Sequence, residues 1–597
     1  MGTLLLATIL LPLVGAALTG GPRAWSRTVA LVATLLTLLM AAILIAQCPV
    51  GDATPAAGMQ RIAGAVGPGE FVVVEDLSRL GLPKAPAGGI QFSVGLDGLS
   101  VWLFGLTTLL MIVAVLISWE AIRERAAAYY SLLLLLEAGM LGVFVARDII
   151  LFYVFFEFTL IPLFFLIGIW GSEQRRYAAI KFFLFTLAGS VLTFLGLLAI
   201  VLWYYYQTGT MTFSIPELTA GLPDHPIGPS AQIAIFLALF AGFAIKVPLF
   251  PFHTWLPLAH VEAPTAGSVI LAGVLLKVGA YGFVRFCLPM LPDAAAVLMP
   301  WLLWIAVAGI IYGALVALVQ EDIKRLIAYS SVSHLGFCML GVFALNRLGM
   351  QGGVLQMINH GLSTGGLFAL VGMLYERYHT RQIKDLGGLA RRTPVLAFFM
   401  LLFTLSSIGL PGLNGFAGEF LLLVGMFQRA RMGTPLGSDA HFLPIAVLAT
   451  AGVVLGAWYM LHLVQRVFFG PVREPEAAST PSHSAGTPEV ADLGLREIVA
   501  LASLSVFIFW IGLQPGFFLD RMSPTLDPIT AAAAKSLRQP AGAVSQRPVV
   551  SGQWSVVRNA RRLRSAGGGT GVSPVPGQRA PATLVSTSTP GEVTRVE

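Results

Sequence analysis

The sequence predicts an all-α polytopic membrane protein with about 14 transmembrane helices. Hydrophobic residues make up 56% of the 597 residues, charged residues only 11%, and the mean hydropathy is +0.80. Ordinary soluble chains carry roughly 25% charged residues, and the apolar runs here approach the ~20 residues that cross a bilayer. A conventional soluble enzyme, a coiled coil and a disordered chain are therefore excluded for most of the length.

Apolar runs, read with a transmembrane-sized window, predict fourteen spans, and the pattern is compatible with 12 to 15. The first run lacks a positive leader region and a small-residue cleavage site, which favours a retained span over a signal peptide. The predicted spans lie near 2–19, 27–46, 98–118, 129–146, 149–170, 179–204, 231–250, 264–287, 297–319, 325–345, 354–377, 393–428, 443–468 and 496–519.

The pattern divides the chain into six parts. They are N-terminal spans 1–3 with a long loop (1–128), a first repeat of spans 4–8 (129–290), a second repeat of spans 9–13 (291–470), a polar loop (471–495), span 14 (496–521) and a flexible basic tail (522–597). The tail is rich in Pro, Gly, Ser, Thr and Arg, a composition typical of segments without a packed core.

Charge placement predicts the orientation. Connections after odd-numbered spans hold 17 Lys and Arg, against 8 after even-numbered spans, so the odd connections are expected in the cytoplasm and both termini outside. Residues 521–597 hold ten basic and three acidic residues, a net +7 that equals the charge of the whole chain. The basic balance therefore belongs to the tail and predicts no nucleic-acid partner.

No motif for a cofactor is present. Cys48, Cys287 and Cys338 are far apart, without a CxxC pair or a Cys/His set at metal-ligand spacing. The sequence also lacks GxGxxG after a strand, GxxxxGK[ST] and HExxH. We expect neither a metal nor a redox or nucleotide cofactor on this chain.

Ionisable residues inside the predicted spans point to function. Each costs about 2.5–3.5 kcal/mol at the membrane centre on insertion scales, so it needs a partner, water or a role. A polar track through the helix bundle explains all of them economically. These residues are Glu137, Glu157, Lys246, Lys277, His334, His360 and Glu419.

Two of these charges lie beside predicted helix breaks. Pro248 and Pro251 follow Lys246, and the Pro/Gly-rich segment 407–415 precedes Glu419. Broken helices at matching places of two halves are typical of transporter ion sites. If spans 4–8 and 9–13 are repeats, each break falls in the fourth helix, and the odd number of spans inverts the second repeat.

A structural role is the alternative to a functional one, and its weight differs from residue to residue. For Lys246, Glu157 and Glu419, depth combines with an opposite charge or a break and favours a functional role. Glu137 suits a structural role equally well, and Arg147-Asp148 resembles a short turn. Four further residues are open to a relay or a structural role, and for the two histidines an interfacial or capping position is favoured: His253, His260, Glu262 and Lys324.

Four segments together resemble the antiporter-like membrane subunits of respiratory complex I, across roughly residues 90–470. They are 148–162 (DIILFYVFFEFTLIP), 246–268 (KVPLFPFHTWLPLAHVEAPTAGS), 322–334 (DIKRLIAYSSVSH) and 409–419 (GLPGLNGFAGE). The resemblance implies a multi-pass subunit of a bacterial inner membrane, in the proton-pumping arm of NADH-quinone oxidoreductase. It also implies sister antiporter-like subunits as neighbours, and NADH, FMN, iron–sulfur clusters and quinone bound by other subunits.

The resemblance also implies roles by position. Glu157 matches the glutamate that pairs with the pump lysine, Lys246 matches that lysine, and Lys277 and His334 match the central relay. His360 matches a further relay member, and Glu419 matches the last residue of the exit channel, where sister subunits typically carry Lys. The long tail and Arg147 depart from the family pattern.

Two other classes remain open. A subunit of a multi-subunit monovalent cation/proton antiporter, or of a membrane-bound hydrogenase complex, would use similar half-channels. A structural subunit that has lost pumping is disfavoured, because the series of charged residues is intact.

Overall fold

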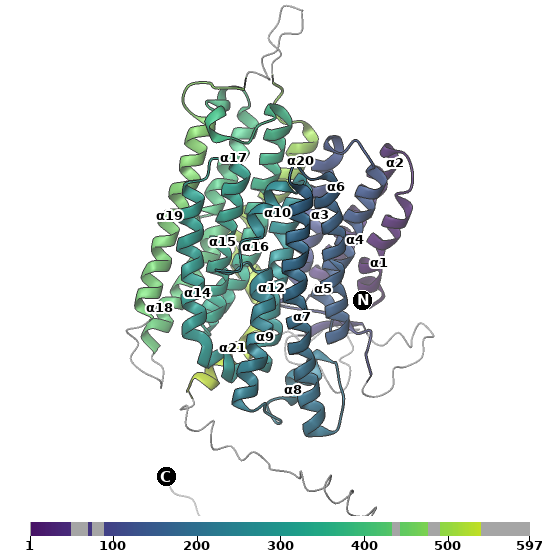
Figure 1. The fold of residues 1–597 in the computed structure, drawn as a ribbon, viewed down its shortest axis with the longest axis vertical. Helices are drawn as coiled ribbons and strands as arrows, with labels where there is room; N and C mark the ends of the chain where they lie inside the picture. Colours follow the sequence, from purple (N-terminus) through teal and green to yellow (C-terminus); the bar gives the residue numbers. More distant parts are fainter. Residues whose placement is uncertain (1, 49–69, 75–88, 433–441, 476–489, 539–597) are drawn as a thin grey trace, which may run out of the picture. The chain divides into compact units, whose positions relative to one another are not determined.

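The computed structural model describes residues 2–48, 70–74, 89–432, 442–475 and 490–538, all within one compact unit that spans residues 1–545 (Figure 1). The predicted polar loop and basic tail therefore lie mostly outside the described residues. Most of the described part is helical, as predicted.

The helices and strands of the first half of the chain include most of the short elements. In chain order they are α1 (Gly2–Leu18), α2 (Arg23–Ala46), β1 (Glu70–Val74), β2 (Val94–Asp97), α3 (Ser100–Ala121), α4 (Ala126–Val145), α5 (Ile149–Phe158), α6 (Leu160–Trp170), α7 (Arg175–Thr208), α8 (Ile215–Gly221), α9 (Pro229–Lys246), α10 (Leu256–Glu262), α11 (Thr265–Ile270), the π-helical η2 (Leu271–Leu275), α12 (Leu276–Gly282), the π-helical η3 (Phe283–Cys287) and α13 (Leu288–Met290).

The second half consists mainly of long helices. They are α14 (Pro292–Leu318), α15 (Ile323–Phe343), α16 (Arg347–Tyr378), the short 3-10 turns η4 (Ile383–Asp385) and η5 (Leu389–Arg391), α17 (Pro394–Ser407), α18 (Asn414–Met432), α19 (Leu443–Phe468), α20 (Leu495–Leu513) and α21 (Pro515–Arg538).

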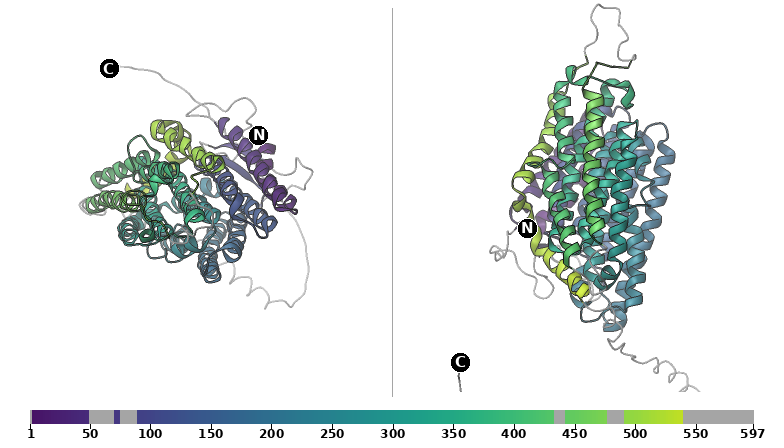
Figure 2. Two further views of the ribbon diagram at one scale, coloured as in Figure 1. Left: turned by 90° about the horizontal axis from the view of Figure 1, so that it is seen from above. Right: turned by 90° about the vertical axis from the view of Figure 1, so that its left-hand side faces the viewer.

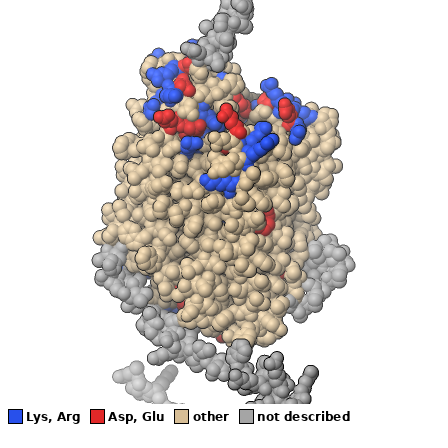
Figure 3. Space-filling model, in the orientation of Figure 1, with Lys and Arg blue, Asp and Glu red and all other residues tan. Residues whose placement is uncertain are grey.

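Within the described ranges, twelve helices are long and apolar enough to cross a membrane, and Gly2–Leu18 and Pro394–Ser407 are shorter apolar helices. Every one of the fourteen predicted ranges overlaps one of these segments. In the face shown by Figure 3, Lys, Arg, Asp and Glu gather at the upper end, and the surface below is almost free of charge. Such a band is what a helix bundle exposes to lipid.

The apolar stretch of α16 is entirely buried inside the bundle, whereas the purple N-terminal helices lie at its edge (Figure 2), and only a third of the apolar stretch of α2 is buried. Small residues let α16 approach its neighbours closely. A Cβ on Gly353 would lie 2.7 Å from the carbonyl oxygen of Cys338 on α15, so only glycine permits this contact. Close approach through small residues is the usual basis of helix association in membranes.

Both predicted breaks are present. α9 ends at Lys246, and α10 starts only at Leu256; α17 ends at Ser407, and α18 starts at Asn414. Proline removes a backbone donor and crowds the preceding turn, which ends α9, and the Pro/Gly segment does the same after α17. The predicted span 393–428 is therefore two helices.

Aspartates begin matching helices in the two halves. Asp148 accepts hydrogen bonds from the amides of Ile150 and Leu151 at the start of α5, which confirms the predicted turn. Asp322 caps α15 in the same way through Arg325. Each aspartate also forms an isolated antiparallel bridge with the connection after the next span, at Ser214 and Gln382 respectively.

Two features of the fold were not predicted. β1 and β2 form a small antiparallel sheet in the loop 47–97, with Val72 opposite Leu96. Asp97, at the end of β2, binds Arg285 of η3 at 2.6 Å. Burial alone would raise the pKa of the Asp97 carboxyl, but the charge and hydrogen bond of Arg285 bring it below its usual value.

The prediction that residues 522–597 form a flexible tail is wrong for 522–538, which belong to α21. This helix buries one stripe at helical spacing, and a hydropathy window misses the stripe because the other faces are polar. Pro524 and Pro528 also obscure it. α21 is held to α16 by the pairs Gln351–Ser523 and Arg347–Asp527. The buried stripe is Met522, Leu526, Thr530, Ala533 and Leu537.

Candidate functional site

Lys246 is the last residue of α9 and lies directly at the first break. The residue is only 5% exposed, and its Nζ lies 4.5 Å from the ring centroid of Phe156 on α5. A Cβ on Gly279 of α12 would come within 2.8 Å of the Lys246 Cβ, so the lysine also packs against the helix that carries Lys277. The break therefore holds a cation between α5 and α12.

Glu157 follows Phe156 on α5 and faces the same region. Its carboxylate interacts electrostatically with the Lys246 ammonium and lies close to the Ser190 hydroxyl. The described residues contain no ion pair within 4.0 Å between Glu157 and Lys246, and the buried Oε1 atom of Glu157 has no hydrogen-bond partner. The two residues are thus neighbours without direct contact, and their predicted pairing stays a prediction.

Four of the predicted residues form one row across the centre of the bundle. Lys277 Nζ lies 2.6 Å from His360 Nδ1, and also binds the carbonyl oxygen of Ala272. The His360 and His334 rings are 5.8 Å apart between centroids. His334 Nδ1 lies 3.5 Å from a carboxylate oxygen of Glu419. Residues from α12, α16, α15 and α18 thus meet in one buried row.

A neutral hydrogen-bond network surrounds the end of this row, and the sequence reasoning missed it. Gln356 donates to Glu419 at 3.1 Å, and Asn359 donates to Gln356 at 3.1 Å and to the carbonyl of Asn414 at 2.7 Å. Ser406 donates to the side chain of Asn414 at 2.6 Å. The available signal was Asn414 itself, at the second break, together with amide side chains inside the apolar span 354–377.

Lys277 lies in a short α-helical stretch between the two π-helical segments η2 and η3. Such segments widen a helix by one residue per turn and occur frequently at functional sites. The wider turn of η2 contains Ala272, whose carbonyl oxygen binds the lysine. Nothing in the residue types of 271–275 distinguishes this stretch from ordinary helix.

The two predicted histidines near the first break do not join the row. His253 is buried against the rings of Phe250 and Tyr312, at 5.9 and 5.1 Å between centroids. His260 stacks on Phe368 at 4.5 Å, and neither of its ring nitrogens has a hydrogen-bond partner. Both histidines are held mainly by aromatic contacts.

Three charged residues have other surroundings. Glu262 accepts a hydrogen bond from the amide of Gln174, just before α7. Lys324 donates to the carbonyls of Val261 and Ala263 at the end of α10. These are capping contacts. Glu137 on α4 is completely buried, and neither carboxylate oxygen has a hydrogen-bond partner.

No group of three or more potential metal ligands occurs in the described ranges, and their three cysteines are free and buried. Chemically, the buried row offers groups that exchange protons, namely an amine, two imidazoles and a carboxylate.

Comparison with known proteins identifies consistent relatives. The family described as "NADH:quinone oxidoreductase/Mrp antiporter, TM" matches residues 146–434. NADH-quinone oxidoreductase subunit M of Rhodobacter capsulatus is 41% identical over 510 residues, covering 84% of this chain and 90% of that protein. NADH-ubiquinone oxidoreductase chain 4 of Chondrus crispus is 41% identical over 438 residues, covering 73% and 82%.

Solved structures extend the similarity to the fold. A chain of respiratory complex I from Thermus thermophilus superposes with a TM-score of 0.72 at 34% identity, covering 90% of this chain and 100% of that one. A chain of the Mrp complex from Dietzia sp. gives a TM-score of 0.69 at 21% identity, covering 91% and 99%. At that identity the second likeness concerns the fold alone.

Proposed function

The chain belongs to the NADH-quinone oxidoreductase subunit M (chain 4) family, and from this premise we propose that it moves protons through a side-chain relay. Lys246 and Glu157 form the control end, Lys277, His360 and His334 form the centre, and Glu419 forms the end that leads out. The observation that carries the proposal is the buried row of Lys277, His360, His334 and Glu419, which lies where ionisable groups are expensive.

The control step uses the electrostatics of Lys246. An apolar environment disfavours the charged ammonium, and a nearby carboxylate favours it. When Glu157 approaches, Lys246 holds its proton; when Glu157 withdraws or is protonated, the proton passes towards Lys277. The break after α9 supplies a segment that can move.

The surrounding assembly supplies the driving reaction. NADH, FMN, iron–sulfur clusters and quinone are bound by other subunits, and sister antiporter-like subunits flank this chain. The protein resides in the bacterial inner membrane with both termini outside, as the excess of Lys and Arg in odd-numbered connections supports.

Two inverted repeats, spans 4–8 and 9–13, underlie this mechanism. Asp148 and Asp322 support them, because each caps the second helix of its repeat and bridges to the connection after the third. Lys246 lies immediately before the first break, and Glu419 lies in the first turns after the second break.

The decisive experiment replaces the control lysine in the assembled complex. In inside-out vesicles, Lys246→Ala should nearly abolish NADH-driven acidification and reduce coupled NADH-to-quinone turnover, while the complex still assembles. Lys181→Ala, on α7 beside Tyr177, is the matched control and should pump normally. Normal pumping by an assembled Lys246→Ala complex would refute the proposal, and acidification that requires sodium would favour a cation antiporter.

A further inference from the structure

A buried ion pair lies at the end of the first repeat that faces outwards in the proposed orientation, which we call the outer end. Arg285 of η3 binds Asp97 of β2 at 2.6 Å, with 15% and 6% of the two side chains exposed. Arg285 also donates to the Tyr281 hydroxyl at 3.0 Å, and its guanidinium lies 5.1 Å from the centroid of that ring. Burying two charges costs free energy, and the proposed relay does not use this pair.

The aspartate connects separate elements at the outer end. Its carboxylate accepts hydrogen bonds from the amides of Leu99 and Ser100 at 3.1 and 3.0 Å, at the start of α3. The same side chain holds Arg285, which lies about 12 Å beyond Lys277 along the segment from α12 to η3. The pair therefore joins the start of α3 to the outer end of the helix that carries the central lysine.

A small cavity adjoins the pair. Its volume is about 20 Å³, which is enough for about one water molecule. The lining includes both members of the pair together with Arg147, Tyr281 and Ile215. Ile215 belongs to α8, which lies at the lower end of the bundle in Figure 1, away from the charged upper end in Figure 3. The polar groups at the outer end thus gather around a space for a single water molecule.

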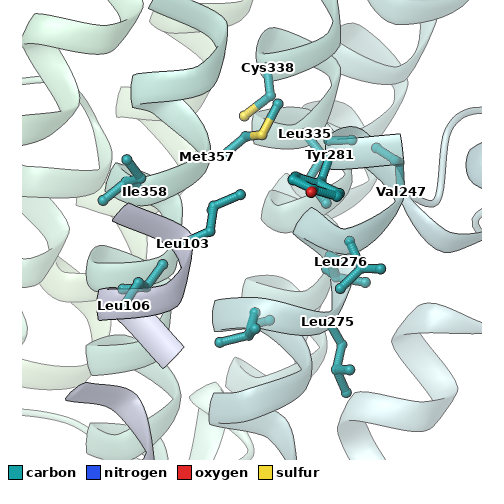
Figure 4. Packing of buried hydrophobic residues seen from close by; sticks show 14 of the residues in the cluster. Leu103, Leu106, Val247, Leu275, Leu276, Tyr281, Leu335, Cys338, Met357 and Ile358 are labelled. Carbon is teal, nitrogen blue, oxygen red and sulfur yellow. The ribbon is translucent and has the colours of Figure 1, made fainter. Parts of the chain in front are cut away.

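Five buried aromatic rings lie between the pair and the relay, and we call them the aromatic layer. Tyr281, shown within the buried hydrophobic cluster in Figure 4, lies 5.4 Å from Phe144 and 6.4 Å from Phe152 between ring centroids. Phe286 lies 4.7 Å from Phe152 and 6.2 Å from Phe243. None of the five is more than 1% exposed. They are Phe144 of α4, Phe152 of α5, Phe243 of α9, Tyr281 of α12 and Phe286 of η3.

The aromatic layer lies on the outer side of the relay lysines. Phe243 precedes Lys246 by about one turn on α9, a helix that begins at the outer end. Tyr281 follows Lys277 by about one turn, on a helix that ends there. An apolar constriction interrupts a column of water, and without water or polar groups a proton has no path. The layer therefore separates both lysines from the ion pair.

We propose that Asp97 and Arg285 are positioning residues that keep the aromatic layer closed, so that Lys246 and Lys277 do not exchange protons with the outside. This inference rests on the proposed function. As a pair, the two charges satisfy each other without water, whereas either one alone would draw water into the outer end, because a buried charge needs a partner or hydration. With this end closed, protons leave beside Glu419 at the second break, which gives the relay its direction.

The test measures passive proton leak through the purified complex in proteoliposomes. Arg285→Gln leaves the Asp97 carboxylate without its ion-pair partner, so an imposed pH gradient should decay at least about fivefold faster without NADH. Acidification per NADH oxidised should fall, while NADH-to-quinone turnover of the assembled complex stays the same. A purely structural role would instead lower assembly and turnover together.

Two variants control for the loss of an ion pair. Arg377→Gln breaks a matched pair elsewhere in the bundle, since Arg377 binds Glu497 at 2.7 Å with 14% and 7% of the side chains exposed, and this variant should not leak. Asp97→Asn/Arg285→Gln removes both charges and keeps an acceptor for the amides of α3. Because it leaves no charge alone, its leak should stay within about twofold of the native value.

A further variant tests the aromatic layer while the ion pair stays intact. Phe286→Ser places a hydroxyl among the rings and should leak, whereas Phe398→Ser, on the exposed side of α17, should not. A tight Arg285→Gln or Phe286→Ser complex, an equal leak in either control, or an undiminished leak in the neutral double variant would each overturn the proposal. Normal pumping by Lys246→Ala refutes the relay without changing the leak of Arg285→Gln, so the two failures are distinguishable.

Discussion

The two helix breaks place their charges in different surroundings. At the first break the Lys246 ammonium lies over the Phe156 ring, and Trp255 donates to the carbonyl of Ile245 at 2.9 Å. At the second break Glu419 accepts from Gln356 and lies beside His334. An aromatic face attracts a cation without fixing it to one partner, whereas hydrogen bonds fix geometry. We therefore interpret the first break as the control point and the second as a fixed conduit.

Removing the link between the two breaks should have the largest effect. Lys277→Ala deletes the amine that contacts His360, on the helix that packs against Lys246, so NADH-driven acidification should fall at least about tenfold. The measurement is quenching of a pH-sensitive dye in inside-out vesicles, normalised to assembled complex. Pumping within twofold of the native complex would mean that the two breaks are not joined through α12.

Removing a hydrogen bond to Glu419 at the second break should have an intermediate effect on acidification. Gln356→Leu keeps the volume but removes a donor to Glu419, and a typical hydrogen bond contributes about 0.5–1.5 kcal/mol. We expect acidification to fall about fivefold with assembly unchanged. Gln351→Leu is the matched control on the same helix, because Gln351 bonds to Ser523 of α21 instead. Similar losses in the two variants would indicate a general effect on α16.

Changing the aromatic contact should have a smaller effect. Phe156→Leu keeps an apolar wall but removes the ring beneath Lys246, whose attraction for the ammonium is weaker than a hydrogen bond to a charged group. The expected loss of acidification is two- to threefold, measured in the same vesicles. Phe155→Leu, one residue earlier on α5, should pump normally. A tenfold loss in Phe156→Leu would show that the ring fixes the lysine, which would contradict the flexible control point.

Glu137 should contribute least. Its carboxylate is buried without hydrogen-bond partners, so Glu137→Gln keeps the size of the side chain and breaks no hydrogen bond. Acidification should stay within about twofold of the native value. A loss as large as that of Glu157→Gln, tested side by side, would place Glu137 in the relay.

Features that change local chemistry strongly could be predicted from the sequence. Both helix breaks were predicted from prolines and glycines, namely Pro248, Pro251 and the 407–415 segment. The row was predicted because burying an ionisable side chain such as Lys277, His334 or Glu419 costs free energy. Neutral Gln356 and Asn359 gave no comparable signal, because one amide in an apolar helix costs far less than a charge. The distance between Glu157 and Lys246 depends on side-chain rotation and packing, which residue types do not determine. The helix α21 was not predicted because its stripe of buried residues is narrow and its other faces are polar.

The π-helical segments on either side of Lys277 have a consequence for rotational register. Each wide turn accommodates one residue more than an α-helical turn, so it rotates everything beyond it by about 100° relative to a regular helix. Because of these two turns, the orientation of Lys277 in the stretch Leu276–Gly282 is independent of the two helix ends, which pack elsewhere in the bundle. The middle of this helix therefore presents Lys277 to His360 of α16, while the two ends keep their own packing.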